Sequence, residues 1–271
     1  PGKQLRTILE GQPKAIGSKV LSAEQSNPSI MYGDALFVKL YRKLEAGINP
    51  DQELLKFLTE KVQYDNVPTF GGTLEYHKPG VEPVTVALAQ SVVPSSSDGW
   101  EYTLGVAVSF FEDILAHGLE VAPPPADEFS PAFTTTPEVL PEGVRGRLDG
   151  HFLEMIDLLG VRTADLHKAL GARSDIADFK PEPFNQLYQR SLYQSMRGLV
   201  DRNLQGVKRV LRHIPAGARE EARRLLASRD TILDTMQEIL RSKLRAKRTR
   251  IHGDYHLGHL LYTGKDFVII N

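Results

Sequence analysis

The feature that most constrains the fold of this sequence is the octet H-G-D-Y-H-L-G-H at residues 252–259. A long basic segment of helical character precedes the octet, and the apolar run 267–270 follows it. A polar loop followed by a short apolar run predicts a β-hairpin, and residues 263–264 (Thr-Gly) are a turn signal for it. Asp254, beside Gly253, is either a carboxylate placed for proton transfer or a residue that caps a turn.

The composition is that of an ordinary globular protein. The 271 residues are 41% hydrophobic and 25% charged, enough for one large or two modest domains. The net charge of −1 indicates neither nucleic acid nor membrane as a partner. The absence of cysteine excludes disulfides and thiolate metal sites, and it fits a cytoplasmic protein. No run approaches the ~18 apolar residues of a membrane span.

The N-terminal third is predicted to be mostly β-structure. Short apolar runs separated by polar or glycine-containing breaks predict strands at 20–25, 29–32, 35–41, 74–77 and 84–92. One helix interrupts them, because Asn49 is a good N-cap, Pro50 suits the first helical position and Asp51 suits the first turn.

The rest of the chain is predicted to be mainly helical. Helices are expected at 100–119, 151–170, 183–213 and 217–247. The Pro- and Thr-rich stretch 121–142 is read as an excursion rather than a domain linker. The prediction is therefore an α+β fold with a β-rich lobe over residues 1–94 and a helical lobe over residues 95–271.

The octet resembles the corresponding loop of the bacterial maltokinase family, which is aminoglycoside-phosphotransferase-like and often fused to trehalose synthase. Further stretches resemble this family in the same order along the chain: residues 23–27 (A-E-Q-S-N), 32–34 (Y-G-D), 39–51 (K-L-Y-R-K-L-E-A-G-I-N-P-D), 162–167 (R-T-A-D-L-H) and 188–197 (Y-Q-R-S-L-Y-Q-S-M-R). The collinear set is more specific than the HGD loop alone.

The resemblance implies a two-lobe protein-kinase-like fold and ATP-dependent phosphorylation of maltose to maltose 1-phosphate. It implies ATP and Mg²⁺ as cofactors, maltose as acceptor and trehalose synthase as a fusion or complex partner. It also implies that the family's C-terminal segment and N-terminal cap subdomain lie outside this chain. The alternatives are a related phosphotransferase with another acceptor, or a non-catalytic kinase-like module associated with trehalose synthase.

Lys39 lies in the middle of a predicted strand and therefore needs an anionic partner. By the resemblance, Lys39 binds the ATP phosphates and Glu53, on the following helix, orients it. The alternatives are an edge-strand lysine that points to solvent, and a Glu53 that only complements the helix dipole.

Four further positions are predicted to bind the nucleotide. Ser26 and Asn27 occupy the place of a loop that covers phosphates, and a simple hairpin turn is the alternative. Gln90 and Val92 end a strand where kinase-like folds place the hinge that binds adenine through its backbone.

The resemblance makes Asp254 the catalytic base, and it makes His259 and Asn271 the metal-site residues. His252 is expected to tie the loop to neighbouring backbone. Maltokinases usually carry Gln at the position of His259, and an Asp is expected at the position of Asn271. Since Mg²⁺ prefers oxygen ligands and imidazole suits softer metals, His259 affects the affinity for the metal or the choice of metal. Asn271 keeps one oxygen but lacks the charge that holds Mg²⁺ on the phosphates, and it is read as a natural substitution, an engineered inactivation or a misread residue.

A basic tract covers the end of the last predicted helix and the residues after it: Arg241, Lys243, Arg245, Lys247, Arg248 and Arg250. We read it as the solvated C-terminus of that helix, favoured by the helix dipole, and a role in attracting ATP is the alternative. The tract lacks interleaved aromatic residues, so it does not indicate nucleic-acid binding.

Overall fold

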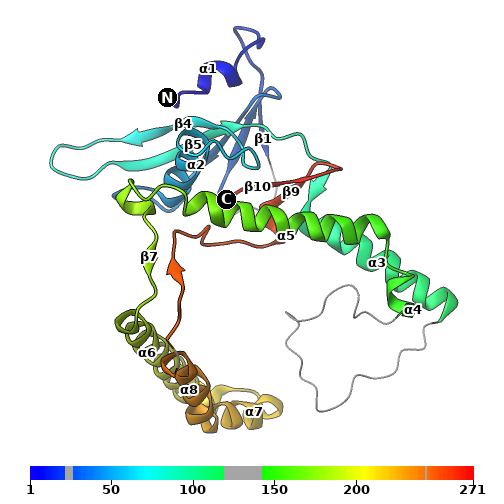
Figure 1. Cartoon of the computed structure of the whole chain (residues 1–271), viewed down its shortest axis with the longest axis vertical. Coiled ribbons are helices and arrows are strands. Elements are labelled where there is room, and N and C mark those ends of the chain that lie inside the picture. The colour runs from blue at the N-terminus through cyan, green and yellow to red at the C-terminus, as the bar shows by residue number, and fades with distance from the viewer. Residues whose placement is uncertain (22–26, 119–141, 242) are drawn as a thin grey trace. The chain divides into compact units, whose positions relative to one another are not determined.

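A computed structural model describes residues 1–21, 27–118, 142–241 and 243–271. The fold is α+β, as predicted, with a five-stranded sheet and many helices (Figure 1). The chain divides into two compact units. Unit 1 comprises Pro1–Arg173 together with Ile251–Asn271, and unit 2 comprises Ser174–Arg250. The predicted boundary between residues 94 and 95 therefore lies inside unit 1.

The five-stranded sheet of unit 1 is antiparallel, with the strand order β1-β2-β3-β5-β4. Its strands are β1 (Ser18–Leu21), β2 (Ser29–Tyr32), β3 (Leu36–Leu40), β4 (Phe70–Tyr76) and β5 (Val84–Ser91). On the central strand β3, Lys39 is paired with Ser29 of β2 and Leu88 of β5. The edge-strand alternative for Lys39 is therefore wrong.

Helix α2 (Pro50–Glu60) packs beside the sheet and begins where the sequence predicted. The side chain of Asn49 accepts hydrogen bonds from the backbone N–H groups of Asp51 (2.9 Å) and Gln52 (3.2 Å), as an N-cap residue does. Pro50 occupies the first turn, where no N–H is needed. The buried side of the helix is formed by Leu54, Leu55, Phe57 and Leu58. A short helix, α1 (Leu5–Ile8), lies against β4.

A second, three-stranded sheet has the order β10-β9-β6 and carries the end of the chain. It consists of β6 (Ser97–Asp98), β9 (Leu260–Tyr262) and β10 (Phe267–Ile269). Residues 263–266 join β9 to β10, and Gly264 there has a φ of 88°, which glycine adopts without strain. This is the hairpin that the sequence predicted after the octet.

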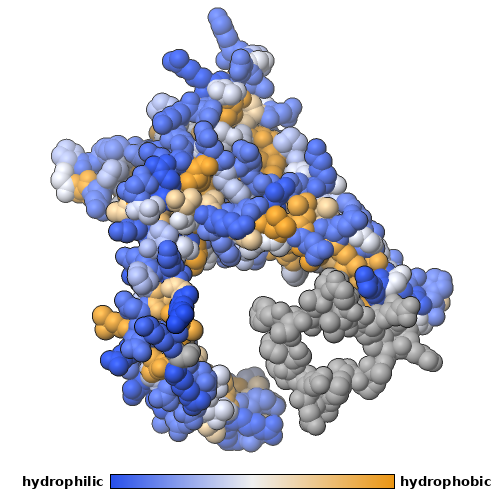
Figure 2. Space-filling model, in the orientation of Figure 1, coloured by the Kyte–Doolittle hydropathy of each residue, from blue (hydrophilic) through white to orange (hydrophobic). Residues whose placement is uncertain are grey.

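Helices α3 (Gly99–His117) and α5 (Gly150–Leu170), with the short α4 (Glu142–Arg145), complete unit 1. Leu166 and Leu170 of α5 are buried, as are Leu260, Phe267 and Ile269 of the hairpin. Helix α3 contacts β9 and leaves part of its surface apolar and exposed, at Trp100, Leu104, Val108, Phe111 and Leu115. Figure 2 shows hydrophobic residues gathered over the region of α3 and α5.

Unit 2 is mainly helical and differs from the prediction near its end. It contains η3 (Ala177–Phe179), β7 (Glu182–Pro183), α6 (Gln186–Val210), η4 (Leu211–His213), α7 (Ala216–Ala227), α8 (Arg229–Gln237), η5 (Glu238–Leu240) and β8 (Lys247–Arg248). The predicted continuous helix 217–247 is wrong, because it breaks at Ser228 and ends near residue 240.

The basic tract of unit 2 is consequently not a helix C-terminus. Strand β8 pairs with β7, where Arg248 forms an ion pair with Glu182. The Arg248 guanidinium also lies 4.4 Å from the ring centroid of Tyr188. The tract is therefore partly held by a short β-ladder.

Some predictions fall on residues outside the described ranges: Ser26, most of the predicted strand 20–25 and nearly all of the stretch 121–142. In the described part of the chain, none of the helices combines the length and apolar character that a bilayer span requires.

Candidate active site

Lys39 of β3 contacts both the start of α2 and the segment after β10. Its Nζ lies 2.8 Å from Asp51 Oδ2 on α2 and donates a 3.1 Å hydrogen bond to the backbone carbonyl of Asn271, just after β10. The side chains of Lys39 and Asp51 are only 20% and 19% exposed. Solvent therefore screens this ion pair less than a surface pair.

Asp51 is the acceptor at the centre of this cluster. Besides Lys39, it accepts hydrogen bonds from the Tyr41 hydroxyl (2.9 Å) and from Asn271 Nδ2 (2.7 Å). Burial raises the pKa of Tyr41, and the neighbouring charge of Asp51 adds to that rise. Tyr41 consequently stays protonated and donates to Asp51. We call Lys39, Tyr41, Asp51 and Asn271 the Lys39 cluster.

The carboxylate beside Lys39 is Asp51, where the sequence predicted Glu53. Residues of an α-helix are spaced about 100° apart, so Glu53 lies about 200° around the helix from Asp51. The Asn49 cap fixes the start of α2 and thereby turns Asp51 toward β3. The predicted helix is correct, but the residue of this helix that pairs with Lys39 is Asp51 and not Glu53.

His252 anchors the octet to the strand that follows it, as predicted. Its Nδ1 accepts from the Asp254 backbone N–H (3.4 Å), so its Nε2 carries the proton and donates to the Ile270 carbonyl (2.9 Å). Burial lowers the pKa of His252, which favours this neutral form. The ring therefore links the start of the octet to the backbone beside Asn271.

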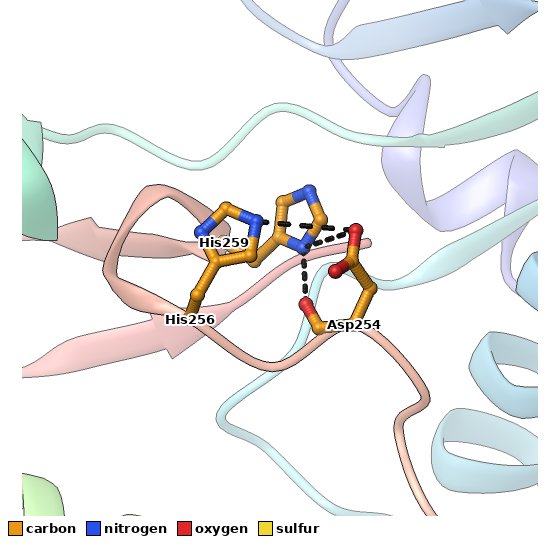
Figure 3. A group of neighbouring side chains, drawn as sticks. All are labelled: Asp254, His256 and His259. Atoms are coloured by element: carbon orange, nitrogen blue, oxygen red, sulfur yellow. Dashed lines mark hydrogen bonds and ion pairs between the residues drawn. The ribbon is translucent and has the colours of Figure 1, made fainter. Parts of the chain in front are cut away.

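Asp254 extends from the loop into solvent, with its side chain 72% exposed. Its carboxylate faces two imidazole rings: Oδ2 lies 3.9 Å from His256 Nε2 and 3.7 Å from His259 Nδ1 (Figure 3). An exposed carboxylate is open to a substrate hydroxyl, so the position suits the predicted base.

His259 lies deeper than Asp254, with its side chain 24% exposed. Its Nδ1 lies 2.6 Å from the backbone oxygen of Asp254 and donates to that oxygen in the neutral ring. The rings of His256 and His259 lie 4.2 Å apart between centroids. In addition, the Ile270 backbone N–H donates to the His259 carbonyl at 2.9 Å, which ties the octet to the end of β10.

A cavity of about 670 Å³ is lined by residues of both the Lys39 cluster and the octet. Lys39 and Asn271 come from the cluster, and His256 and His259 come from the octet. Its apolar walls include Leu21, Met31, Phe37, Leu261 and Ile270. A cavity of this size, mainly apolar with a few polar groups, is typical of sites for small molecules.

Three of the predicted nucleotide-binding residues also line this cavity: Asn27, Gln90 and Val92. Asn27 Oδ1 accepts from the Arg42 backbone N–H (3.1 Å), and the Val92 N–H donates to the Ala35 carbonyl (2.9 Å). The Val92 N–H is therefore already engaged within the sheet region. Asp254 and Glu53 are not among the described residues that line the cavity.

The donor atoms around the cavity fit the two implied cofactors differently. The Lys39 ammonium group suits the anionic phosphates of a nucleotide, and the apolar walls of the cavity suit its flat base. Mg²⁺ requires oxygen ligands in near-octahedral geometry. The predicted metal residues supply one imidazole and one amide, and the Asn271 amide nitrogen is held by Asp51. This pair does not fit Mg²⁺.

Two members of the site were missed from the sequence, Tyr41 and Asp51. Tyr41 lies two positions after Lys39, and alternation along a strand places such residues on the same side. Asp51 stands two positions after the N-cap, where acidic residues are common for helix-dipole reasons alone. Only the folded structure, in which α2 brings Asp51 to Lys39 of β3, distinguishes Asp51 from Glu53.

A scan against models of known protein families finds no match for this sequence. The resemblance to maltokinases rests on the residues quoted above.

Proposed function

We propose that this chain is an ATP-dependent phosphotransferase of the maltokinase type, with a two-lobe protein-kinase-like fold. One observation carries the proposal: Lys39 of β3 and, more than 200 positions later, His259 and Asn271 line one cavity of about 670 Å³. A basic side chain, a strand end and the second half of the octet line this cavity, and Asp254 lies in the same octet; these are parts that phosphoryl transfer to an alcohol requires.

In the proposed reaction, the acceptor is the anomeric hydroxyl of maltose. A bond forms between that oxygen and the γ-phosphorus of ATP, while the bond from the γ-phosphorus to the β,γ-bridging oxygen breaks. ADP leaves with the electrons of that bond, and the hydroxyl proton passes to the Asp254 carboxylate. The exposed carboxylate, placed by the His252 contacts to Ile270 and Asp254, orients the hydroxyl.

Lys39 binds phosphate oxygens in this proposal. Its present partners, Asp51 and the Asn271 carbonyl, hold the ammonium at the cavity wall. A phosphate that approaches Lys39 adds a second anion beside Asp51, so Asp51 acts as a positioning residue for Lys39. ATP enters as its magnesium complex, and the His259–Asn271 pair contributes little to holding that ion.

The test is an assay of maltose-dependent ADP formation, with the phosphorylated carbon identified by ³¹P NMR. We expect Asp254→Asn to lower kcat by roughly 10²–10⁴-fold, the usual contribution of a general base. Lys39→Ala is expected to raise KM for ATP. The maltose assignment is abandoned when neither the wild-type chain nor Asn271→Asp turns over ATP with maltose. Turnover with another sugar, an aminoglycoside or choline in an acceptor screen selects the related phosphotransferase instead.

One observation favours a second candidate, a non-catalytic kinase-like module associated with trehalose synthase. Asn271 places an amide where the resemblance expects a carboxylate, and this amide is bonded to Asp51. Such a module would bind ATP without transferring its phosphate. Calorimetry with ATP and Mg²⁺, run beside the turnover assay and a pull-down with trehalose synthase, distinguishes the two candidates.

A further inference from the structure

Asp254, His256 and His259 bring three metal-ligating side chains to one point of the octet (Figure 3). One potential ligand atom of each residue lies within 4.8 Å of those of the other two. We propose that these three side chains form a binding site for a borderline divalent cation such as Zn²⁺. The site is distinct from the predicted magnesium pair, because Asp254 and His256 replace Asn271 as partners of His259.

The spacing of the donor atoms carries the proposal. Ligands about 2.0–2.1 Å from a tetrahedral metal lie roughly 3.3–3.4 Å from one another. Asp254 Oδ2 lies 3.7 Å from His259 Nδ1 and 3.9 Å from His256 Nε2. Side-chain movements of a few tenths of an ångström would therefore bring these two pairs to tetrahedral spacing, and the donor atoms of the two histidines already lie within 4.8 Å of each other.

The types of donor select the metal. Two imidazoles and one carboxylate suit Zn²⁺, Co²⁺ or Ni²⁺, whereas Mg²⁺ and Ca²⁺ require oxygen. Three protein ligands leave a fourth tetrahedral position for water or another small ligand, as in catalytic rather than structural zinc sites. The exposure of Asp254 (72%) and His256 (55%) gives a cation direct access from solvent.

Metal binding would replace two hydrogen bonds of the histidine rings with metal–ligand bonds. His256 Nδ1 accepts from the Gly258 backbone N–H (3.1 Å), and His259 Nδ1 contacts the Asp254 carbonyl (2.6 Å). Coordination through His256 Nε2 and His259 Nδ1 moves each ring proton to the other nitrogen. Each histidine gives up one hydrogen bond, and each ring turns away from its present backbone partner to face the metal.

A cation at this site would regulate the proposed function. This inference rests on the proposed function. Zn²⁺ binds the Asp254 carboxylate oxygen that would accept the substrate proton, and it therefore inhibits phosphoryl transfer. In His259→Gln, which carries the residue usual in maltokinases, this inhibition should be lost.

The binding test uses Co²⁺ alone as the probe and needs no activity. We expect one Co²⁺ per chain with the visible bands of a tetrahedral complex, displaced by Zn²⁺. His256→Gln and His259→Gln should each weaken binding by at least roughly tenfold, the lower limit for loss of even an outer-shell partner. His117→Gln is the matched control, because His117 also faces a carboxylate, Asp113 at 2.9 Å, but belongs to no group of three metal-ligating side chains in the described part of the chain. Circular dichroism establishes that each variant is folded.

Absence of tetrahedral bands, or equal Co²⁺ affinity in wild type and all three variants, overturns the metal site. The activity arm is separate: Zn²⁺ should inhibit wild-type turnover at concentrations at least tenfold lower than those that inhibit His256→Gln. Tetrahedral Co²⁺ binding in a chain without turnover supports the metal site and counts only against the phosphotransferase proposal.

Discussion

Lys39 donates a hydrogen bond to the main-chain carbonyl of Asn271, 232 positions later in the chain, at 3.1 Å. The Asn271 side chain contacts Asp51, the ion-pair partner of Lys39, because its Nδ2 donates a hydrogen bond to Asp51 Oδ1 at 2.7 Å. Asn271 thus contacts both members of the ion pair, one through its backbone and the other through its amide. The cavity side of the central sheet and the end of β10 are therefore held by a single set of polar contacts.

Replacement of Asp51 should destabilise the chain more than replacement of the exposed Asp34. Asp51→Asn removes the charge that compensates Lys39 and weakens the acceptor for Tyr41. We expect a loss of about 1–3 kcal/mol in the free energy of unfolding, measured with urea, because both groups are largely shielded from water. Asp34→Asn makes the same chemical change at an exposed position and is the matched comparison. Equal losses in the two variants would contradict the assignment of Asp51 as the partner.

Asn271→Asp should make stability depend on magnesium. The new carboxylate would face Asp51 at the position where an amide now donates a hydrogen bond. Without divalent ions, we expect the free energy of unfolding to fall by about 1–2 kcal/mol through lost bonding and like-charge repulsion. Mg²⁺ should restore part of this loss, since two carboxylates offer it oxygen ligands. Thermal unfolding with and without Mg²⁺ measures the effect. Asn271→Ala, which adds no charge, should show no response to the ion.

The Arg162–Asp266 pair should make unfolding sensitive to acid. Arg162 Nε and Nη2 donate to the two oxygens of Asp266 at 2.9 and 2.7 Å, and this contact lowers the pKa of Asp266 below its ordinary value of 3.8. A lowered carboxyl pKa stabilises the folded chain above 3.8, and the stabilisation disappears as pH falls through the folded-state pKa.

Asp266→Asn should therefore cost about 1–3 kcal/mol near neutral pH and progressively less below pH 3.8. Urea unfolding over this pH range gives the difference between wild type and variant. Asp65→Asn, at an exposed position, is the control and should change stability by less than about 0.5 kcal/mol. A difference that is constant with pH would argue against the pair as the cause.

Tyr255 should anchor the octet to α5. Thr163 Oγ1 donates to the Leu159 carbonyl (2.8 Å), so at its 2.7 Å contact with Tyr255 it is the acceptor and Tyr255 is the donor. Tyr255→Phe should cost about 1 kcal/mol, and Thr163→Val should cost more, because it leaves a half-buried hydroxyl without its acceptor. A double-mutant cycle by urea unfolding should give a coupling of at least ~0.5 kcal/mol. Tyr76→Phe, at a residue 60% exposed, is the neutral control.

Much of the fold follows from local signals in the sequence. The Asn49 cap with Pro50 predicts the start of α2, and the short apolar run around Lys39 predicts β3. The apolar run 267–270 with the Thr-Gly turn predicts the β9–β10 hairpin. These signals act over a few residues, so one sequence is enough to detect them.

What the sequence did not predict depends on contacts between distant segments. Asp51 and Glu53 both suit a helix N-terminus, and only the packing of α2 decides which one meets Lys39. The 217–247 pattern is helical in composition, yet its last residue, Lys247, begins β8 and pairs with Pro183 of β7, a contact between distant segments. The meeting of Asp254, His256 and His259 depends on the loop conformation that the His252 contacts fix.

The arrangement of unit 1 also has a consequence for synthesis. The cluster around Lys39 needs residues 251–271, but unit 2, residues 174–250, is translated before them. At roughly 5–20 residues per second, the ribosome takes several seconds to cross that insert. During that interval, the nascent sheet and α2 lack the hairpin that buries against α5. Transiently exposed apolar surface of this kind makes an incomplete chain prone to aggregate.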